Sequence, residues 1–379
     1  MVQAAYIHIP FCVHICHYCD FNKVFLKGQP VDEYLHALKK EIIMTLNEPP
    51  KNELKTVFVG GGTPTSLSAE QLKKLCEIIR SLLPVSKDAE VTFEANPGDL
   101  TEEKLYLLRE GGVNRLSIGV QSFEEHLLEK IGRTHRNEDV YNTVSNAKKV
   151  GFDNISIDLM YGLPGQTLED FIHSMKEAFS LNIQHLSSYS LIVEPKTVFY
   201  NLMRKGKLRL PSEEDDAMMY DTLMKMAKEN GLKQYEISNF ARPGYESKHN
   251  LTYWNNEEYY GFGAGAHSYM NQVRKSNVGP VNHYIQQIQQ GNLPILEEWQ
   301  LSETERMEEE MFLGLRKVDG VSIETFIKKF EKDPLKLFSQ QLSKLKRDGL
   351  IDINSGYIKL TKKGMFLGNT VFQEFIGVI

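Results

Sequence analysis

Three of the four cysteines in this 379-residue chain lie close together, at Cys12, Cys16 and Cys19. The segment IHIPFCVHICHYCDF spaces them as Cys-x3-Cys-x2-Cys, directly after a short apolar run. Thiolates are soft ligands that bind iron–sulfur clusters, and at this spacing each thiolate can reach a different iron atom. Three thiolates on a four-iron cluster leave the fourth iron without a protein ligand. The motif therefore predicts a [4Fe–4S] cluster with one iron open to a small molecule.

Other uses of clustered cysteines fit this chain less well. A structural zinc site takes four ligands in two pairs, so it would also need His14 or His17. A disulfide framework is typical of small secreted domains, whereas this long chain has four cysteines and no signal peptide. The fourth cysteine, Cys76, recurs with leucines and isoleucines at helical spacing. We interpret Cys76 as a core residue and not as a cluster ligand.

The composition is that of an ordinary globular protein. Hydrophobic residues make up 41% of the chain and charged residues 25%. A net charge of −6 argues against broad electrostatic binding of nucleic acid. No apolar run approaches the length of a membrane span. Because clustered free cysteines need a reducing compartment, we expect a cytoplasmic protein, and a peripheral contact with a membrane stays open.

Strand and helix patterns alternate along the first half of the chain. With amphipathic helical stretches between them, apolar strand patterns occur at residues 4–9, 56–62, 90–97, 115–123, 154–164 and 185–195. Strand–helix units in series predict parallel strands joined by right-handed crossovers. In β/α barrels the functional loops lie at the carboxyl ends of the strands. We therefore predict an α/β fold built as a partial (β/α)6 barrel.

The pattern changes after about residue 195. A helical stretch leads to a polar, aromatic-rich segment, and the C-terminal region reads as helices followed by a small β-hairpin. Residues 301–379 carry 13 Lys and Arg against 12 Asp and Glu, which is too balanced for a DNA-binding surface. We expect this region to be a lid or a partner surface. The predicted domains are a core at 1–235, an accessory segment at 236–300 and a mostly helical, winged-helix-like domain at 301–379.

Polar and glycine-rich segments at the strand ends predict a shared binding site. GGGTPT, at residues 60–65, ends the second strand, where glycine backbone admits a ligand closely and N–H groups can hold a carboxylate. Glu94 follows the third strand pattern, Gln121 the fourth and Asp158 the fifth. A single polar residue at the end of a strand would usually cap a neighbouring helix or contact solvent. Because three occur in successive units, we expect them to face one site.

The cysteine loop resembles the signature of radical S-adenosylmethionine (SAM) proteins. Together, YIHIPFC, CDFN, GGGTPT, GVQSF, IDLMYGLPGQT and GFGAG resemble the oxygen-independent coproporphyrinogen III oxidase group of that superfamily. The resemblance covers nearly the whole chain and implies a radical SAM barrel whose [4Fe–4S] cluster is bound by the three clustered cysteines. It also implies that the cluster-bound SAM contacts Tyr6, Gly61 and Glu94. A neighbouring region, which holds a second SAM in the oxidase, corresponds to Tyr18, Gly62, Thr63, Gln121, Arg133 and Asp158.

Three features depart from the oxidase pattern. The oxidase has a further cysteine two residues after its third ligand, whereas this chain has Phe21. The oxidase also has a long N-terminal segment, whereas few residues precede Cys12 here. Finally, the chain contains HNLTYW, from His249 to Trp254. This HNxxYW motif marks the HemW branch of the group, whose members are haem chaperones.

The motif HNLTYW contains residue types that suit haem. The imidazole of His249 could be an axial ligand of the iron, and Tyr253 and Trp254 offer flat surfaces for the porphyrin. A histidine in a polar loop is more often a surface or hydrogen-bonding residue, and His267 in GFGAGAHSYM is a second candidate. Whether haem would attach covalently stays open.

The resemblance therefore implies a haem chaperone that carries a [4Fe–4S] cluster and exchangeable SAM. Its expected partners are haem and haem-acceptor proteins, including membrane-bound respiratory proteins, and not nucleic acid; a homodimer stays open. The alternative is a coproporphyrinogen III oxidase that cleaves SAM to a radical and decarboxylates a porphyrinogen. Phe21 and HNLTYW favour the chaperone, so enzyme status stays open and oxidase activity is not expected. A radical SAM enzyme that modifies RNA is less favoured, because the chain lacks a basic appendage.

Overall fold

A large curved sheet organises the chain. The computed structural model describes residues 2–46 and 52–379. In chain order, the strands of this sheet are β1 (Ala4–Ile9), β4 (Leu54–Gly61), β5 (Val85–Ala95), β6 (Arg115–Gln121), β7 (Asn154–Tyr161), β8 (His185–Ser190), β9 (Lys233–Glu236), β10 (Asn239–Ala241), β11 (Tyr259–Phe262), β12 (His267–Met270), β13 (Val273–Asn277) and β14 (Ile295–Gln300). Within the described residues they lie in the order β14-β13-β12-β11-β1-β4-β5-β6-β7-β8-β10-β9.

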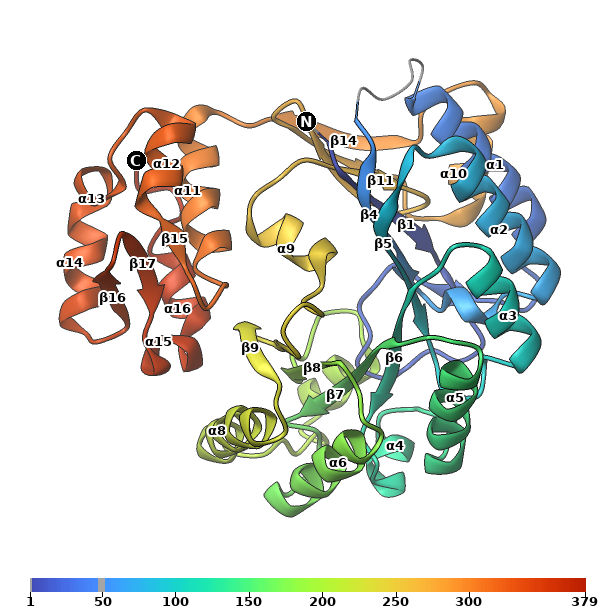
Figure 1. Ribbon diagram of the computed structural model, residues 1–379, viewed down its shortest axis with the longest axis horizontal. Helices are drawn as coiled ribbons and strands as arrows, with labels where there is room; N and C mark the ends of the chain where they lie inside the picture. Colours follow the sequence, from blue (N-terminus) through green and yellow to red (C-terminus); the bar gives the residue numbers. More distant parts are fainter. Residues whose placement is uncertain (1, 47–51) are drawn as a thin grey trace.

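The centre of the sheet is a partial barrel of parallel strands. The strands β1, β4, β5, β6, β7 and β8 pair in parallel in that order. Helices cover the outside of this arc (Figure 1), and they are α1 (Val31–Thr45), α2 (Ala69–Leu82), α3 (Glu102–Glu110), α4 (Glu125–Lys130), α5 (Asn137–Lys149), α6 (Leu168–Ser180) and α8 (Glu213–Glu229). The short helix α7 (Val198–Arg204) follows β8, and its Phe199 N–H donates to the His17 carbonyl of the cysteine loop. The predicted partial (β/α)6 barrel is confirmed. Beyond the prediction, β11 adds a parallel strand on the other side of β1.

Several barrel helices begin at side chains that satisfy their first backbone N–H groups. Ser68 caps α2, Thr167 caps α6 and Ser212 caps α8, each in a reciprocal capping box. Cys76 lies on the buried face of α2 and is 4% exposed, as predicted for a core residue. A short 3-10 turn, η1 (Pro64–Ser66), follows the glycines that end β4.

The parallel strands alternate between apolar and polar faces. On β4, Val57 and Val59 belong to the main hydrophobic core beneath the helices. The intervening Thr56 and Phe58 instead contact His249, which reaches them from a distant part of the chain. Successive side chains of a strand point to opposite faces, so the apolar set packs under the helices and the other set lines the inside of the arc. The barrel therefore has a polar interior in which a site can form.

The accessory region adds a helix that faces this interior. The helix α9 (Lys248–Trp254) contains HNLTYW and packs on β4, and Figure 1 shows it between the barrel and the C-terminal domain. The sequence predicts only a polar, aromatic-rich segment here, so the helix is a finding of the structure. The helix α10 (Val281–Gln289) then packs against α1 on the outside.

The C-terminal region folds around a hydrophobic core of its own. It contains α11 (Glu303–Gly314), β15 (Val321–Ser322), α12 (Ile323–Phe330), α13 (Pro334–Leu337), α14 (Ser339–Arg347), β16 (Ile351–Asn354), β17 (Tyr357–Leu360), α15 (Lys362–Phe366) and α16 (Gly368–Gln373). The helices α12–α14 lie in sequence between β15 and the hairpin of β16 and β17, and the three strands form a small sheet in the order β15-β17-β16, which confirms the predicted winged-helix-like arrangement. Among the described residues, no helix is both long and apolar enough to cross a membrane.

Candidate functional site

A cavity inside the mouth of the barrel brings together most of the residues expected to hold the cluster and SAM. All three clustered cysteines line it, and so do all but one of the residues that the resemblance implied for SAM. These lining residues are Cys12, Cys16, Cys19, Tyr18, Gly61, Gly62, Thr63, Glu94, Gln121, Arg133 and Asp158. They come from the cysteine loop and from β4, β5, β6 and β7 with the segments that follow them. The remaining residue, Tyr6, lies outside this lining.

The cysteine loop begins at a small pair of strands, β2 (Phe11–Cys12) and β3 (Val24–Phe25). Cys12 is buried, while Cys16 and Cys19 are half-buried. The hydroxyl of Thr63 donates to Cys12 Sγ over 3.7 Å, and Arg133 Nη1 donates to Cys16 Sγ over 3.6 Å. These donors stabilise thiolates, which are the form that binds iron.

The donor set of this loop suits an iron–sulfur cluster. Burial raises the pKa of the Cys12 thiol to about 11, so its deprotonation needs a metal or another positive partner. In the part of the chain that the structure describes, no three His, Cys, Asp or Glu residues gather tightly enough for a single metal ion. Three free cysteine thiols that line one cavity are a donor set that suits an iron–sulfur cluster.

The glycines after β4 let other side chains approach the cavity. Gly61 has φ +112°, and a Cβ there would overlap the His8 imidazole. At Gly60 a Cβ would lie 2.7 Å from the Glu94 carboxylate, and at Gly62 it would lie 2.7 Å from the Pro10 backbone. Only glycine fits at these positions, because no side chain can be added without moving a neighbour. The predicted close approach at GGGTPT thus has a geometric basis.

Glu94 and Asp158 lie deeper than the sequence suggested. Both were expected after the ends of their strands, but Glu94 lies within β5 and Asp158 within β7. The polar alternation of the strands explains this, since inward positions need not be apolar. Burial raises the pKa of Glu94 to about 7, although the Gly61 N–H that it accepts at 3.0 Å opposes this shift. Burial also raises the pKa of Asp158, against a hydrogen bond from Ser117.

Arg133 connects the cysteine loop to the strand ends. Besides Cys16, it donates to Asn96 Oδ1 at 2.8 Å and to the carbonyl of Gly119. Its Nε is buried and has no partner among the described residues. An unpaired donor in a cavity leaves a place for a hydrogen-bond acceptor of a ligand. Sequence reasoning missed Asn96, whose side chain also donates to Thr63 Oγ1 at 3.1 Å; its position before a proline just after β5 was the available signal.

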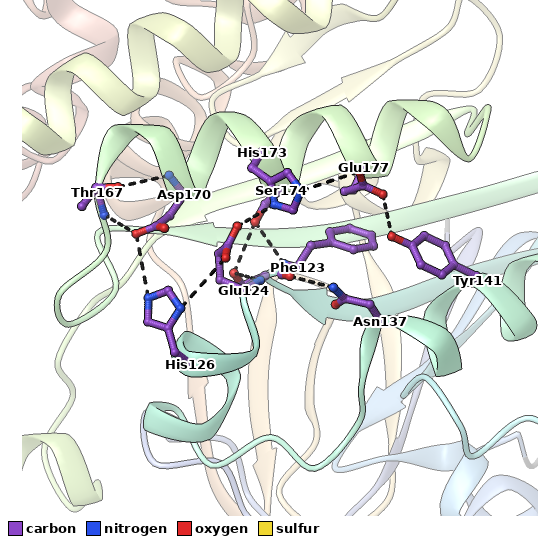
Figure 2. Close-up of polar contacts among 11 residues, drawn as sticks. Phe123, Glu124, His126, Asn137, Tyr141, Thr167, Asp170, His173, Ser174 and Glu177 are labelled. Carbon is purple, nitrogen blue, oxygen red and sulfur yellow. Dashed lines mark hydrogen bonds and ion pairs between the residues drawn. The ribbon is translucent and has the colours of Figure 1, made fainter.

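Gln121 adopts φ +69°, and the segment after it is firmly held. Its Oε1 accepts from Tyr189 at 3.2 Å inside the cavity. Figure 2 shows the polar contacts of the segment that follows: the Phe123 N–H donates to Ser174, and Asn137 donates to the Phe123 carbonyl. In the same network the imidazoles of His126 and His173 lie between carboxylates of neighbouring elements, among them Glu124, Asp170 and Glu177. These contacts hold α5 and α6 against the turn that follows Gln121, and they fix the backbone at the end of β6.

Tyr6 lies below the glycines. Its hydroxyl is hydrogen-bonded to His8 Nδ1 at 2.9 Å, and His8 Nε2 is bonded to the Asn22 carbonyl at 2.7 Å. The Tyr6 ring stacks on Phe58 with centroids 6.3 Å apart. Tyr6 therefore supports the cavity through His8, which lies directly under Gly61.

The three haem candidates lie on α9. His249 is 1% exposed, and its two ring nitrogens are hydrogen-bonded to Thr56 and Tyr253 at 2.8 and 2.9 Å. Burial lowers the pKa of His249 to about 3, and the Arg115 guanidinium adds to the effect. Trp254 lies under the Arg316 guanidinium, 4.3 Å from its ring centroid. In this conformation His249 has no nitrogen available to an iron, whereas the alternative candidate, His267, is exposed.

Comparisons with known proteins place this site in a family. The model of the radical SAM superfamily matches residues 6–178, and the model of the HemN C-terminal domain matches residues 301–367. The heme chaperone HemW of Bacillus subtilis (strain 168) is 55% identical to this chain, over 99% of the chain and 100% of that protein. This chain belongs to the HemW family. HemW of Lactococcus lactis subsp. lactis (strain IL1403) is 48% identical, over 99% of the chain and 97% of that protein.

A solved structure resembles this chain over its whole length. The radical SAM enzyme coproporphyrinogen III oxidase (HemN) from Escherichia coli matches with a TM-score of 0.87 at 26% identity. The match covers 100% of this chain and 91% of the oxidase chain. The predicted relation to the oxidase group and its HemW branch is thereby confirmed, as is the fold class. This chain and the oxidase thus share one architecture, and a shared fold does not by itself assign a function.

Proposed function

We propose that this chain is a haem chaperone, which binds haem and passes it to acceptor proteins. The observation that carries the proposal is its full-length similarity to HemW proteins together with an intact HNLTYW motif. Phe21, at the position where the oxidase pattern has a further cysteine, lines the mouth of the cavity and is 63% exposed. We propose haem-acceptor proteins, including membrane-bound respiratory proteins, as partners, and the cytoplasm as the location.

The proposed cluster ligands are Cys12, Cys16 and Cys19, and the open iron would bind the amino acid end of SAM. When bound, the cluster supplies an electron and a Lewis-acidic iron to its ligand. Around it, the Gly61 backbone and Glu94 are positioned to bind SAM, and Tyr6 supports them from below. Gln121, Arg133 and Asp158 offer further polar atoms, with Tyr18, Gly62 and Thr63 completing the wall.

Haem would bind at α9, with His249 as the iron ligand and Tyr253 and Trp254 against the porphyrin. His249 Nδ1 is bonded to Thr56 on the barrel wall and Nε2 to Tyr253 on the same helix, so iron binding requires α9 to separate from the wall or the Tyr253 hydroxyl to turn away. Contacts with the porphyrin can offset part of that cost, since burial of apolar surface is worth roughly 25 cal/mol per Å².

Haem titration of the reconstituted protein tests the proposal. His249→Ala should weaken haem retention at least tenfold and change the absorption spectrum, because it removes the proposed axial ligand. Its cluster iron should stay at the parent level, since the cysteines lie on another loop. His283→Ala is the matched control, because His283 is exposed on α10. Equal haem spectra and affinities for His249→Ala and the parent would exclude this site and make His267 the next residue to test.

The rival function, decarboxylation of coproporphyrinogen III, is favoured by the shared fold alone. We expect no conversion by the protein with its cluster intact and a reductant present. The assay follows product formation anaerobically in parallel with iron content. Robust conversion would reverse the ranking of the two functions.

A further inference from the structure

The proposed haem ligand is enclosed by the barrel. His249 is 1% exposed and stacks on Phe58 with ring centroids 5.2 Å apart. The backbone N–H groups of Lys248 and His249 both donate to the Glu90 carboxylate at 3.1 Å. One side-chain bond (His249 to Thr56), one stacking contact and two backbone bonds thus hold the start of α9 against β4 and β5, while the bond from His249 to Tyr253 lies within the helix. A haem iron could reach His249 only after these contacts separate.

The same contacts continue upward to the SAM cavity. Phe58 stacks on Tyr6, whose hydroxyl is bonded to His8, and the His8 ring lies against Gly61. These residues form a continuous aromatic column from α9 to the glycine loop: His249, Phe58, Tyr6 and His8. Because close-packed interiors transmit displacement, removing α9 takes away the support at the base of this column.

The other end of α9 is held by the C-terminal domain. Lys317 Nζ donates to Asn255 Oδ1 at 2.5 Å, and Lys329 Nζ donates to the Asn256 carbonyl at 3.3 Å. The Arg316 guanidinium covers Trp254 at 4.3 Å from the ring centroid. These contacts lie at the C-terminal end of the helix, where positive charge is favourable. The C-terminal domain therefore holds α9 in its docked position.

We propose that α9 couples the two sites, so that cluster-bound SAM and haem weaken each other's binding. With α9 docked, the column supports Gly61 and the SAM cavity is complete, but His249 is closed to iron. With α9 withdrawn, His249 is open and the column has lost its base. This coupling rests on the proposed haem site at His249 and goes beyond it, because it assigns the helix a role in SAM binding.

The first test needs no haem. Hydrogen exchange of residues 248–254 is measured on the reconstituted protein with and without SAM, and the change in the cluster spectrum reports SAM occupancy. SAM should slow exchange in α9 at least fivefold. In a Trp299→Phe background, which leaves Trp254 as the sole tryptophan, SAM should also reduce acrylamide quenching. Unchanged exchange with SAM visibly bound would overturn the coupling.

The second test uses both ligands. Saturating SAM should weaken haem affinity at least fivefold, and haem should weaken SAM affinity by the same factor, because coupling between two binding sites is reciprocal. Lys317→Ala loosens α9 and should raise haem affinity and lower SAM affinity, each at least threefold. Lys328→Ala, an exposed lysine on α12, is the matched control and should change neither. Identical behaviour of the two lysine variants would contradict the proposal.

The two proposals fail in different ways. If His249→Ala binds haem like the parent, the haem site is wrong, while protection of α9 by SAM still reports whether the helix supports the cavity. If His249→Ala loses haem but SAM and haem bind independently, the haem site stands and the coupling is wrong.

Discussion

At the scale of single residues, the cysteine loop carries the most direct prediction. Alanine at Cys12, Cys16 or Cys19 should remove most of the cluster iron and sulfide, because each thiolate is expected to bind a separate iron. Cys76→Ala should keep the cluster, since Cys76 lies on the buried face of α2 and packs in the main hydrophobic core. Iron and sulfide assays after anaerobic reconstitution measure this. Equal losses in Cys76→Ala and Cys16→Ala would refute the ligand set.

Gly61 offers a second test at this scale. Gly61→Ala should lower SAM affinity at least tenfold, because the new methyl group displaces His8 from its bonds with Tyr6 and Asn22. Gly112→Ala is the control, since Gly112 also has positive φ but has no atom within 4 Å of the added Cβ. SAM titration of the cluster spectrum compares the two. Equal SAM affinities for Gly61→Ala and Gly112→Ala would contradict the role of His8.

At the scale of elements, the docking of α9 depends on one carboxylate. Glu90 accepts the first two N–H groups of α9, and Glu90→Gln replaces an acceptor oxygen with a donor. We expect a loss of about 1–2 kcal/mol in unfolding free energy and faster hydrogen exchange at residues 248–254. Asp88→Asn, an exposed change on the same strand β5, should do neither. Denaturant unfolding and exchange by mass spectrometry provide both readouts.

At the scale of the whole molecule, buried carboxyl groups should shape stability against pH. Glu41, beneath the GFGAG segment, accepts from Tyr284 and Asn277 at 2.6 Å and from the Gly263 N–H at 2.8 Å. Burial nevertheless raises its pKa to about 7. An acid whose folded pKa is raised binds its proton more tightly when folded, so its contribution is complete at low pH and lost as pH rises through 7.

We therefore expect the unfolding free energy of the metal-free protein to fall between pH 6 and 8, with about 1 kcal/mol of that fall due to Glu41. Glu41→Gln should flatten this part of the profile, even if it lowers stability overall. Below pH 6 the profile should turn down, because burial holds the pKa of His135 and His249 near 3 and the unfolded state binds these protons first. Chemical unfolding from pH 4 to 8 tests both slopes, and an unchanged slope in Glu41→Gln would exclude Glu41 as a source.

Much of the site could be predicted from the sequence because its signals are local. The three cysteines lie on one loop, and their spacing alone indicates ligands of one cluster. The strand–helix alternation indicated parallel strands, and parallel strands bring their carboxyl ends together. The sequence therefore suffices to group residues as distant in the chain as Cys12, Glu94 and Asp158, which line one cavity in the structure. The depth of Glu94 and Asp158 within the barrel could not be predicted, because the inward and outward positions of a strand are distinguished only by what packs on each face.

The state of the haem motif was decided by tertiary structure. HNLTYW looks like an accessible polar loop in the sequence, yet it forms a helix whose His249 is buried. Its partner Thr56 is 193 positions away, and Glu90 is 159 positions away. No local pattern encodes such contacts, since they depend on how the barrel closes around α9. The sequence determined by itself which chemical groups are present and which cofactors suit them, whereas long-range packing decided which of those groups are free to bind.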